Sequence, residues 1–307
     1  MLKRYRLISL GAGTVGLCAV LALPAPALSE TEDVEDESFY QQITRVIIRL
    51  QESVVINRAG ATGKQPVGTA FFVYYKGGDY LVSARHVVDR PVDLHAWVPS
   101  QRHDTRETDV VELQLPTNAW VFHPGDEVKV KVGQKQEKVA AVDVAVAMVP
   151  RIKDRRIRKI GYCPDPCPEG ESQQFADADP EPPAMVLVFG FPGDIGFSLL
   201  EQRPMGRLGM ISMTARQPFL RVDGMLKDSR VVIVDAPIFP GNSGSPIFRR
   251  PELGQPFELL GLISATNVSR SYAIAEPVTR IAEALEHARK AGKPSPSPSW
   301  HPLPGKK

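Results

Sequence analysis

This sequence has little net charge, few cysteines and no visible internal repeat. Its 37 Lys and Arg residues nearly balance its 35 Asp and Glu residues, so the formal net charge is +2. Such a balance gives no electrostatic reason to expect nucleic acid or an anionic membrane as a partner. Among the three cysteines, Cys163 and Cys167 have no histidine nearby with which they could form a metal site. We therefore expect no metal and no other cofactor.

Apolar residues and turn-forming residues are well represented. Hydrophobic residues make up 43% of the chain, which is enough for a packed core and argues against general disorder. The 28 Pro and 24 Gly residues interrupt the chain often, and this favours short strands and turns over long helices.

The first 29 residues are typical of an export signal. Lys3, Arg4 and Arg6 form a positive region, residues 7–23 are mainly apolar, and small residues around position 27 offer cleavage sites. We therefore expect residues 1–29 to be a signal peptide and the mature protein to be periplasmic or secreted, in a bacterium. The alternative is an uncleaved membrane anchor, because the apolar run is near the lower length that spans a bilayer.

Strand signals divide the rest of the chain into two halves. Short apolar or alternating runs fill residues 40–150 and 184–291. The hydrophilic segment 151–183 between them is expected to be a linker or surface loop. Residues 30–39 form an acidic, flexible lead-in, and residues 292–307 form a Pro- and Ser-rich tail that we expect to be disordered.

One helix is expected at the end of the second half, from Glu276 to Ala291. Val278, Ile281 and Leu285 recur there at helical spacing, and Gly292 follows. Many short strands on either side of a linker, with one closing helix, predict an all-β fold of two antiparallel β-barrels.

The linker holds a candidate disulfide in CPDPC, residues 163–167. Its two prolines restrict the backbone and favour a turn that brings Cys163 and Cys167 together. Export would place both thiols in an oxidising compartment. We predict an intrachain disulfide; the alternatives are two free thiols or bonds to another chain.

The stretch APIFPGNSGSPIF, residues 236–248, places Ser243 at a glycine-rich turn between apolar runs. This serine is either an ordinary turn hydroxyl or a nucleophile. A serine nucleophile needs a base, a group that orients the base, and donors for the oxyanion.

His86 and Asp143 are the candidates for the base and its orienting group. Of the six histidines, His86 alone follows a strong strand signal, in YLVSARHVV. Asp143 interrupts the apolar run VAAVDVAVAMV, where an unpaired carboxylate is costly. We expect Asp143 to accept the ring N–H of His86; the alternative is a carboxylate on an edge strand that faces water.

These segments together resemble a known family, the trypsin-like (chymotrypsin-fold) serine proteases. GTAFFV and DYLVSARHVV are similar to the pattern around the catalytic histidine of that family, VDVAVAMV to the strand around its aspartate, and PGNSGSPIF to its nucleophile loop. GLISATN resembles the strand that lines its substrate groove. The resemblance spans roughly residues 53–285 and is closest to bacterial periplasmic quality-control proteases, although we expect no PDZ domain after the helix.

The resemblance implies a serine endopeptidase that has two six-stranded barrels and acts on proteins or peptides. Ser243 would be the nucleophile, His86 the general base and acid, and Asp143 the orienting carboxylate. The N–H groups of Gly241 and Ser243 would form the oxyanion hole. Asn242 stands where digestive relatives have an aspartate that pairs with a newly cut N-terminus, so activation of that kind is not expected.

Arg85 and Ser245 are further departures from the common pattern of the family. They lie directly beside the expected base and two residues after the expected nucleophile. Both bear on the local shape of the site.

A substrate pocket is expected beside the nucleophile. Its candidate residues are Pro237, Ile238, Ile263, Ser264, Ala265, Thr266 and Arg270. Most are apolar or small, which favours a small or medium aliphatic residue before the scissile bond. The alternative is that Arg270 faces the pocket and favours an acidic residue.

Two other functions remain open. One is a catalytically inactive trypsin-like fold that binds proteins. The other is an α/β-hydrolase esterase, which needs a G-x-S-x-G motif, and position 245 here is Ser. The sequence predicts no oligomeric state.

Overall fold

The computed structural model describes fifteen stretches of the chain, all of them within the unit Ser38–Lys307 and none within the other unit, Met1–Glu37. They are residues 43, 45–55, 62–101, 108–125, 127–132, 134–151, 159–162, 174–192, 203–214, 219–222, 225–228, 230–250, 257–267, 271–292 and 298–302. The expected signal peptide, the acidic lead-in and both cysteines of the expected disulfide lie outside the described residues.

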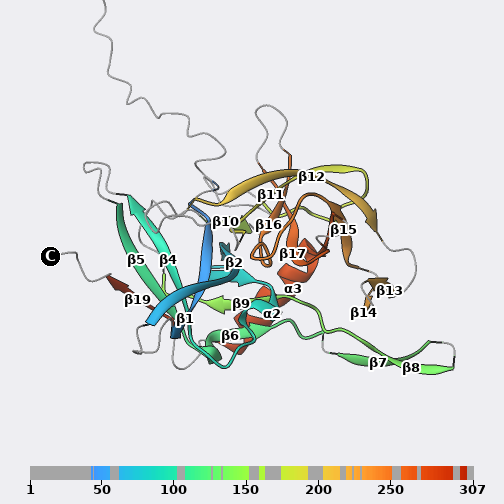
Figure 1. Cartoon of the computed structure of the whole chain (residues 1–307), viewed down its shortest axis with the longest axis horizontal. Coiled ribbons are helices and arrows are strands. Elements are labelled where there is room, and N and C mark those ends of the chain that lie inside the picture. Colours follow the sequence, from blue (N-terminus) through green and yellow to red (C-terminus); the bar gives the residue numbers. More distant parts are fainter. Residues whose placement is uncertain are drawn as a thin grey trace, which may run out of the picture. The chain divides into compact units, whose positions relative to one another are not determined.

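The first half of the fold is a curved sheet of nine strands (Figure 1). Its order is β19-β5-β4-β1-β2-β3-β9-β6, and β10 pairs separately with β2. The strands are β1 (Ile47–Val55), β2 (Thr62–Tyr75), β3 (Gly78–Ser83), β4 (Leu94–Gln101), β5 (Thr108–Leu115), β6 (Trp120–Phe122), β9 (Ala145–Met148), β10 (Ile160–Tyr162) and β19 (Ser299–Pro302). All pairs are antiparallel except β10 with β2.

The second half is a closed barrel of six strands. They are β11 (Ala184–Gly190), β12 (Met205–Thr214), β15 (Val232–Asp235), β16 (Pro246–Arg249), β17 (Leu259–Asn267) and β18 (Tyr272–Pro277). Alternating residues such as Val186, Val188 and Val234 fill its interior and are almost wholly buried. A period of two along each strand therefore gives one buried face, as the sequence pattern predicts.

A third, smaller sheet links segments that belong to the two halves. Strands β7 (Val128–Val132) and β8 (Lys135–Val139) form a hairpin that projects from the fold (Figure 1). β8 meets β14 (Met225–Asp228), which pairs with β13 (Phe219–Val222), and the junction is the parallel pair Leu226↔Val139. The hairpin thus connects the approach to Asp143 with the second half.

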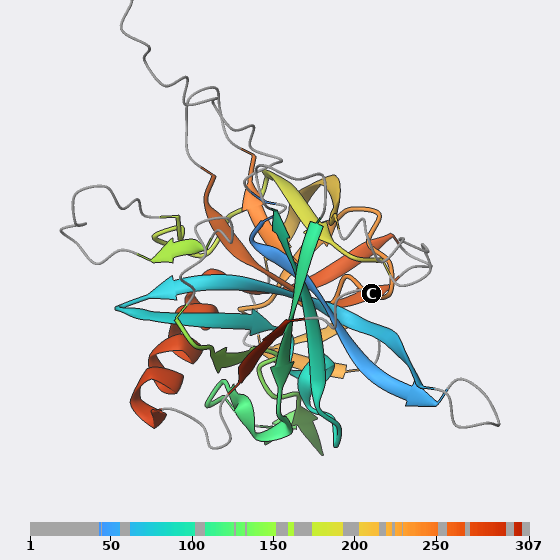
Figure 2. The same cartoon turned by 90° about the vertical axis from the view of Figure 1, so that its left-hand side faces the viewer.

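Three helical elements complete the described fold: α2 (Arg85–Val88), the 3₁₀ turn η1 (Thr117–Ala119) and α3 (Val278–Ala291). α3 buries Ile281, Ala284 and Leu285, and ends at Gly292, whose φ of 82° suits glycine. It packs against β3, β6, β9 and β17, and Figure 2 shows this orange-red helix beside the cyan and green strands of the first sheet. No helix among the described residues is long and apolar enough to cross a membrane.

The predicted fold class is confirmed: the described chain is mostly strand, with one closed six-stranded barrel, a second curved sheet and a C-terminal helix. Two expectations about connecting segments are wrong in part. The linker contributes β10, whose partner is β2. The tail contributes β19, because the edge of β5 is open to pairing and Trp300 finds an apolar neighbour in Phe72, with ring centroids 6.2 Å apart.

Candidate active site

His86 is held at the end of a packed strand. The chain leaves β3 through Ala84, which is extended, and turns into the single helical turn α2. Ala84 and Val87 are buried on either side, whereas the imidazole of His86 is 50% exposed. The scaffold therefore fixes the backbone of His86 and leaves its ring accessible.

The carboxylate of Asp143 binds His86 at two points. Asp143 Oδ1 accepts the backbone N–H of His86 at 2.9 Å, and Oδ2 lies 2.7 Å from Nδ1 of the ring. Because an ionised carboxylate only accepts hydrogen bonds, Nδ1 carries the ring proton and Nε2 is the basic nitrogen. The expected pairing of Asp143 with His86 is present in this geometry, and the alternative of a carboxylate facing water is not.

The charge on Asp143 is stabilised although the group is buried. Burial alone would raise the pKa of this carboxyl, but hydrogen bonds and charge from His86, together with the Ser264 hydroxyl, hold the pKa below its ordinary value. Asp143 is therefore ionised at neutral pH, as a group that orients a histidine base must be.

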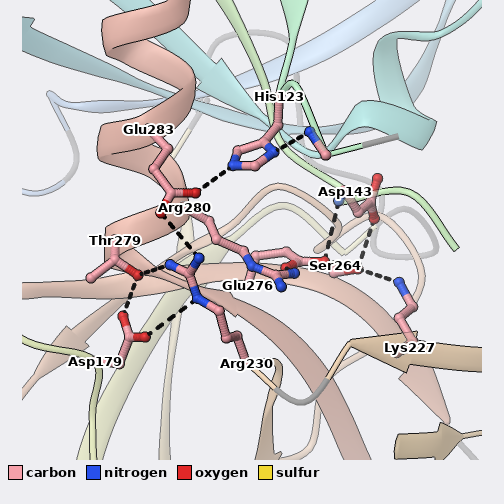
Figure 3. A network of polar contacts seen from close by, with 11 residues as sticks. His123, Asp143, Asp179, Lys227, Arg230, Ser264, Glu276, Thr279, Arg280 and Glu283 are labelled. Atoms are coloured by element: carbon pink, nitrogen blue, oxygen red, sulfur yellow. Dashed lines mark hydrogen bonds and ion pairs between the residues drawn. The ribbon is translucent and has the colours of Figure 1, made fainter. Parts of the chain in front are cut away.

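Ser264, one of the expected pocket residues, supports Asp143 with its hydroxyl group. Its hydroxyl donates to Asp143 Oδ2 at 2.7 Å, and the side chain is wholly buried. The ammonium group of the buried Lys227 donates in turn to Ser264 Oγ at 3.4 Å (Figure 3). That Ser264 also lines the substrate pocket stays a prediction.

Glu276 and Arg280 are polar residues near Asp143 that the sequence analysis missed. Glu276 Oε1 accepts the backbone N–H of Asp143 at 3.2 Å, and Oε2 binds Arg280 Nη1 at 2.7 Å. The signal was present in YAIAEPV, where a carboxylate ends an apolar strand. The argument that singled out Asp143 applies equally to Glu276.

The loop that carries Ser243 is fastened to the first half of the fold. Thr69 donates from its backbone to Ser243 O and from its hydroxyl to Gly241 O, both at 2.9 Å. Gly244 has a φ of 85°, and a Cβ there would collide with the Thr69 carbonyl and lie 2.6 Å from Ser83 Oγ. Only glycine permits this conformation at so close an approach.

The same contacts bring Ser243 to α2. A Cβ placed on Gly68 would lie 2.6 Å from Val87 Cγ1 and 3.1 Å from Ser243 O, so Gly68 lies between these two residues. Val87 is the residue after His86. The structure thus brings the Ser243 loop next to the turn that holds His86.

The expected oxyanion donors, the N–H groups of Gly241 and Ser243, belong to the same loop. In the described chain, hydrogen bonds within and around the loop are donated by the N–H groups of Asn242, Gly244 and Ser245. None of those bonds uses the N–H of Gly241 or Ser243. Their role as an oxyanion hole stays a prediction.

The structure describes all but one of the remaining expected pocket residues. Ile238 and Ile263 are buried, Ala265 and Thr266 are half-buried, and Pro237 is exposed. Arg270 lies outside the described residues, so its expected contact with substrate stays untested. Within the described stretches, no group of His, Cys, Asp and Glu residues could hold a metal ion.

Arg85, a departure from the family pattern, is turned toward neighbouring side chains. Its guanidinium carbon lies 4.6 Å from the centre of the Phe122 ring, and Nε is 3.6 Å from Asp89. The positive charge next to His86 is thus shared with an aromatic face and a carboxylate.

Residues 68–253 match the trypsin-like peptidase domain. No curated protein matches the sequence. Among solved structures, the active form of the Rv3671c protease from M. tuberculosis has 15% identity and a TM-score of 0.43, with 79% of this chain and 80% of that chain covered.

An inactive serine-to-alanine mutant of Rv3671c from M. tuberculosis H37Rv gives 15% identity and a TM-score of 0.44, with 88% and 96% covered. These structural scores are too low to support an argument about function. The family match is different, because it extends from β2 to the residues after β16 and includes His86, Asp143 and Ser243. It takes in more than half of the chain, and the protein therefore belongs to the family of trypsin-like peptidase domains.

Proposed function

We propose that this protein is a serine endopeptidase that hydrolyses peptide bonds with Ser243, His86 and Asp143. The observation that carries the proposal is the His86 ring, which is bound to an ionised, buried carboxylate through Nδ1 and is exposed beside the Ser243 loop. Such an arrangement creates a basic nitrogen at a solvent-accessible surface next to the loop that carries Ser243.

The chemistry follows from these positions. Nε2 of His86 takes the proton of the Ser243 hydroxyl as Oγ bonds to the scissile carbonyl carbon, and the carbonyl oxygen becomes an oxyanion. The N–H groups of Gly241 and Ser243 stabilise this charge. His86 then gives its proton to the departing amine, leaving an acyl-enzyme. Water, deprotonated by His86, attacks the ester and restores the serine.

Substrate preference and location are parts of the same proposal. The half-buried, small residues Ala265 and Thr266 support a preference for a small or medium aliphatic residue before the scissile bond. The charged N-terminal region and the apolar run that follows it support export to the periplasm or the medium. N-terminal sequencing of the protein from cells would test the second point, since an intact Met1 would contradict cleavage.

A fluorophosphonate probe tests the nucleophile directly. We expect stoichiometric labelling of Ser243 and loss of both labelling and peptide hydrolysis in Ser243→Ala. Ser212→Ala is the matched control, because this serine is exposed and donates to the Ile233 carbonyl, away from the candidate active site. If the full chain were neither labelled nor able to hydrolyse peptides, an inactive binding protein would be the better account.

Asp143→Asn tests the role of the carboxylate. An amide can donate to Nδ1 and thereby fix the wrong tautomer of His86, so we expect turnover to fall by about 10⁴-fold while the fold is kept. Steady-state kinetics together with circular dichroism would measure both effects. Near-normal turnover would show that Asp143 does not orient the base.

A further inference from the structure

A buried ion pair lies behind the aspartate of the active site. The Glu276 side chain, at the end of β18, has no exposed surface, and that of Arg280, in the first turn of α3, is 3% exposed. Their closest atoms are 2.7 Å apart. Removing two charges from water is costly, and an apolar pair is often as stable, so stability alone does not explain why these residues are present.

The second carboxylate oxygen of Glu276 contacts the backbone of Asp143. Oε1 accepts the backbone N–H of Asp143 at 3.2 Å (Figure 3). Arg280 holds Oε2 and so fixes the orientation of the carboxylate. The Asp143 amide is thereby connected, through Glu276, to the first turn of α3.

The backbone around Asp143 needs such a partner. Residues 140–144 belong to no strand, because β9 begins at Ala145. Their polar groups are held one at a time: Val142 N donates to Gly125 O at 2.9 Å, and Arg85 N to Asp143 O at 3.3 Å. For the N–H of Asp143, Glu276 supplies the acceptor that a neighbouring strand would otherwise provide.

The orientation of this peptide determines where the Asp143 carboxylate points. Its two oxygens make contacts of 2.9 and 2.7 Å with the backbone and ring of His86, and both contacts require one position of the Asp143 backbone. We propose that Glu276, held by Arg280, is a positioning residue that keeps Asp143 aligned with His86. This inference rests on the proposed function. The competing explanation is that the pair only anchors α3 to β18.

Two double variants separate these explanations. Glu276→Leu with Arg280→Met removes both charges and the acceptor while keeping apolar volume. Glu276→Gln with Arg280→Met also removes both charges but keeps an oxygen that can accept the Asp143 N–H. We expect kcat to fall by about 10- to 100-fold in the first variant, with KM within about twofold, because small misplacements of reacting groups have effects of this size.

Recovery of activity in the glutamine variant decides between the two explanations. The glutamine variant should recover most of the lost kcat at a similar melting temperature. Glu286→Gln is the control, since Glu286 lies on the same helix but binds Tyr75 and Arg289 at the surface. Equal kcat in the two double variants, whether normal or reduced, would overturn the positioning role.

Proton NMR gives a readout that does not depend on turnover. The Nδ1 proton of His86 should resonate far downfield in the wild type, exchange rapidly in the leucine variant and reappear in the glutamine variant. The Asp143 amide proton of the wild type should also exchange slowly, a measurement that needs no variant, and rapid exchange would overturn the proposal. If these signals behave as expected but the wild type neither reacts with the probe nor cleaves peptides, the proposed function fails and the positioning role stands.

Discussion

Lys227 places a positive charge next to the pair formed by His86 and Asp143. The ammonium group binds Ser264 Oγ, and that hydroxyl binds Asp143. An ammonium group only donates hydrogen bonds, so it uses Ser264 Oγ as an acceptor and leaves the hydroxyl proton for Asp143. We therefore expect Lys227→Met to lower kcat by roughly 2- to 10-fold, because the loss of one hydrogen bond is worth about 1 kcal/mol. Steady-state kinetics would measure the change.

This substitution removes the ammonium group but keeps most of the shape of the side chain. Methionine has nearly the same length as lysine, so the variant should fold normally. Lys135→Met, on the exposed hairpin, makes the same change of charge away from the site and should leave kcat unchanged. An unchanged kcat in Lys227→Met would contradict our account of Lys227.

The sequence predicted His86 and Asp143 as a pair because each has an unusual local setting, at a strand end or within an apolar run. The contact of Ser264 with Asp143 was not predicted, since the two residues lie 121 positions apart in the chain. Glu276 was missed for the same reason, although its local pattern resembles that of Asp143. Local patterns thus identify residues that need partners, but they do not name partners from distant strands.

At the scale of elements, His123 connects the end of β6 to α3. Gly125 N donates to Nδ1 at 2.8 Å, so Nε2 carries the ring proton and donates to Glu283 Oε2, also at 2.8 Å (Figure 3). Burial lowers the pKa of His123, against the opposing effect of Glu283; Arg280 lowers it further and Glu276 raises it. Protonation would also break the bond from Gly125, because both nitrogens would then be donors.

This geometry predicts a loss of stability in mild acid. The unfolded chain binds a proton at the ordinary histidine pKa of about 6.5, whereas the folded chain binds it only at lower pH. The stabilising contribution of His123 is therefore complete above that value and declines as the pH falls from there through the folded pKa. Denaturant unfolding between pH 5 and pH 8 should show a smaller decline in His123→Gln than in the wild type.

His287 provides the control for this prediction. It is exposed on the same helix, and His287→Gln should keep the pH dependence of the wild type. An identical decline in His123→Gln would show that groups other than His123 cause the acid sensitivity.

The elements that were not predicted depend on pairing between distant segments. β19 is a short strand in a Pro- and Ser-rich tail, and it exists because β5 leaves an edge to which Ser299–Pro302 can bind. The sheet formed by β7, β8, β13 and β14 joins hairpins from both halves through Leu226↔Val139. Alternation along a strand predicts its faces, whereas its partners depend on the folded arrangement of the whole chain.

At the scale of the whole molecule, the candidate active site is assembled from both halves. His86 and Asp143 come from the first half, and Ser243 comes from the closed barrel. Thr69 on β2 connects them: its hydroxyl donates to Gly241 O at 2.9 Å and accepts the backbone N–H of Phe191 at 3.1 Å. One buried side chain therefore bonds both to the nucleophile loop and to the end of β11.

Thr69→Val tests this connection with little change of shape. The valine leaves Phe191 N and Gly241 O without their partner, which should destabilise the protein by about 1–3 kcal/mol. The Gly241 peptide would also be free to turn its N–H away from the oxyanion. We expect kcat to fall by on the order of tenfold, less than the about 10²- to 10³-fold that follows loss of an oxyanion donor.

Measuring kcat together with the free energy of unfolding shows whether Thr69 orients Gly241 or only holds the two halves together. Thr117→Val, on an exposed 3₁₀ turn, should change neither quantity. If Thr69→Val lost stability but kept kcat, Thr69 would hold the halves together without orienting Gly241. If both fell, as we expect, a peptide-like inhibitor that fills the oxyanion hole should restore part of the lost stability, because such a ligand binds only the state in which the Gly241 N–H faces the site.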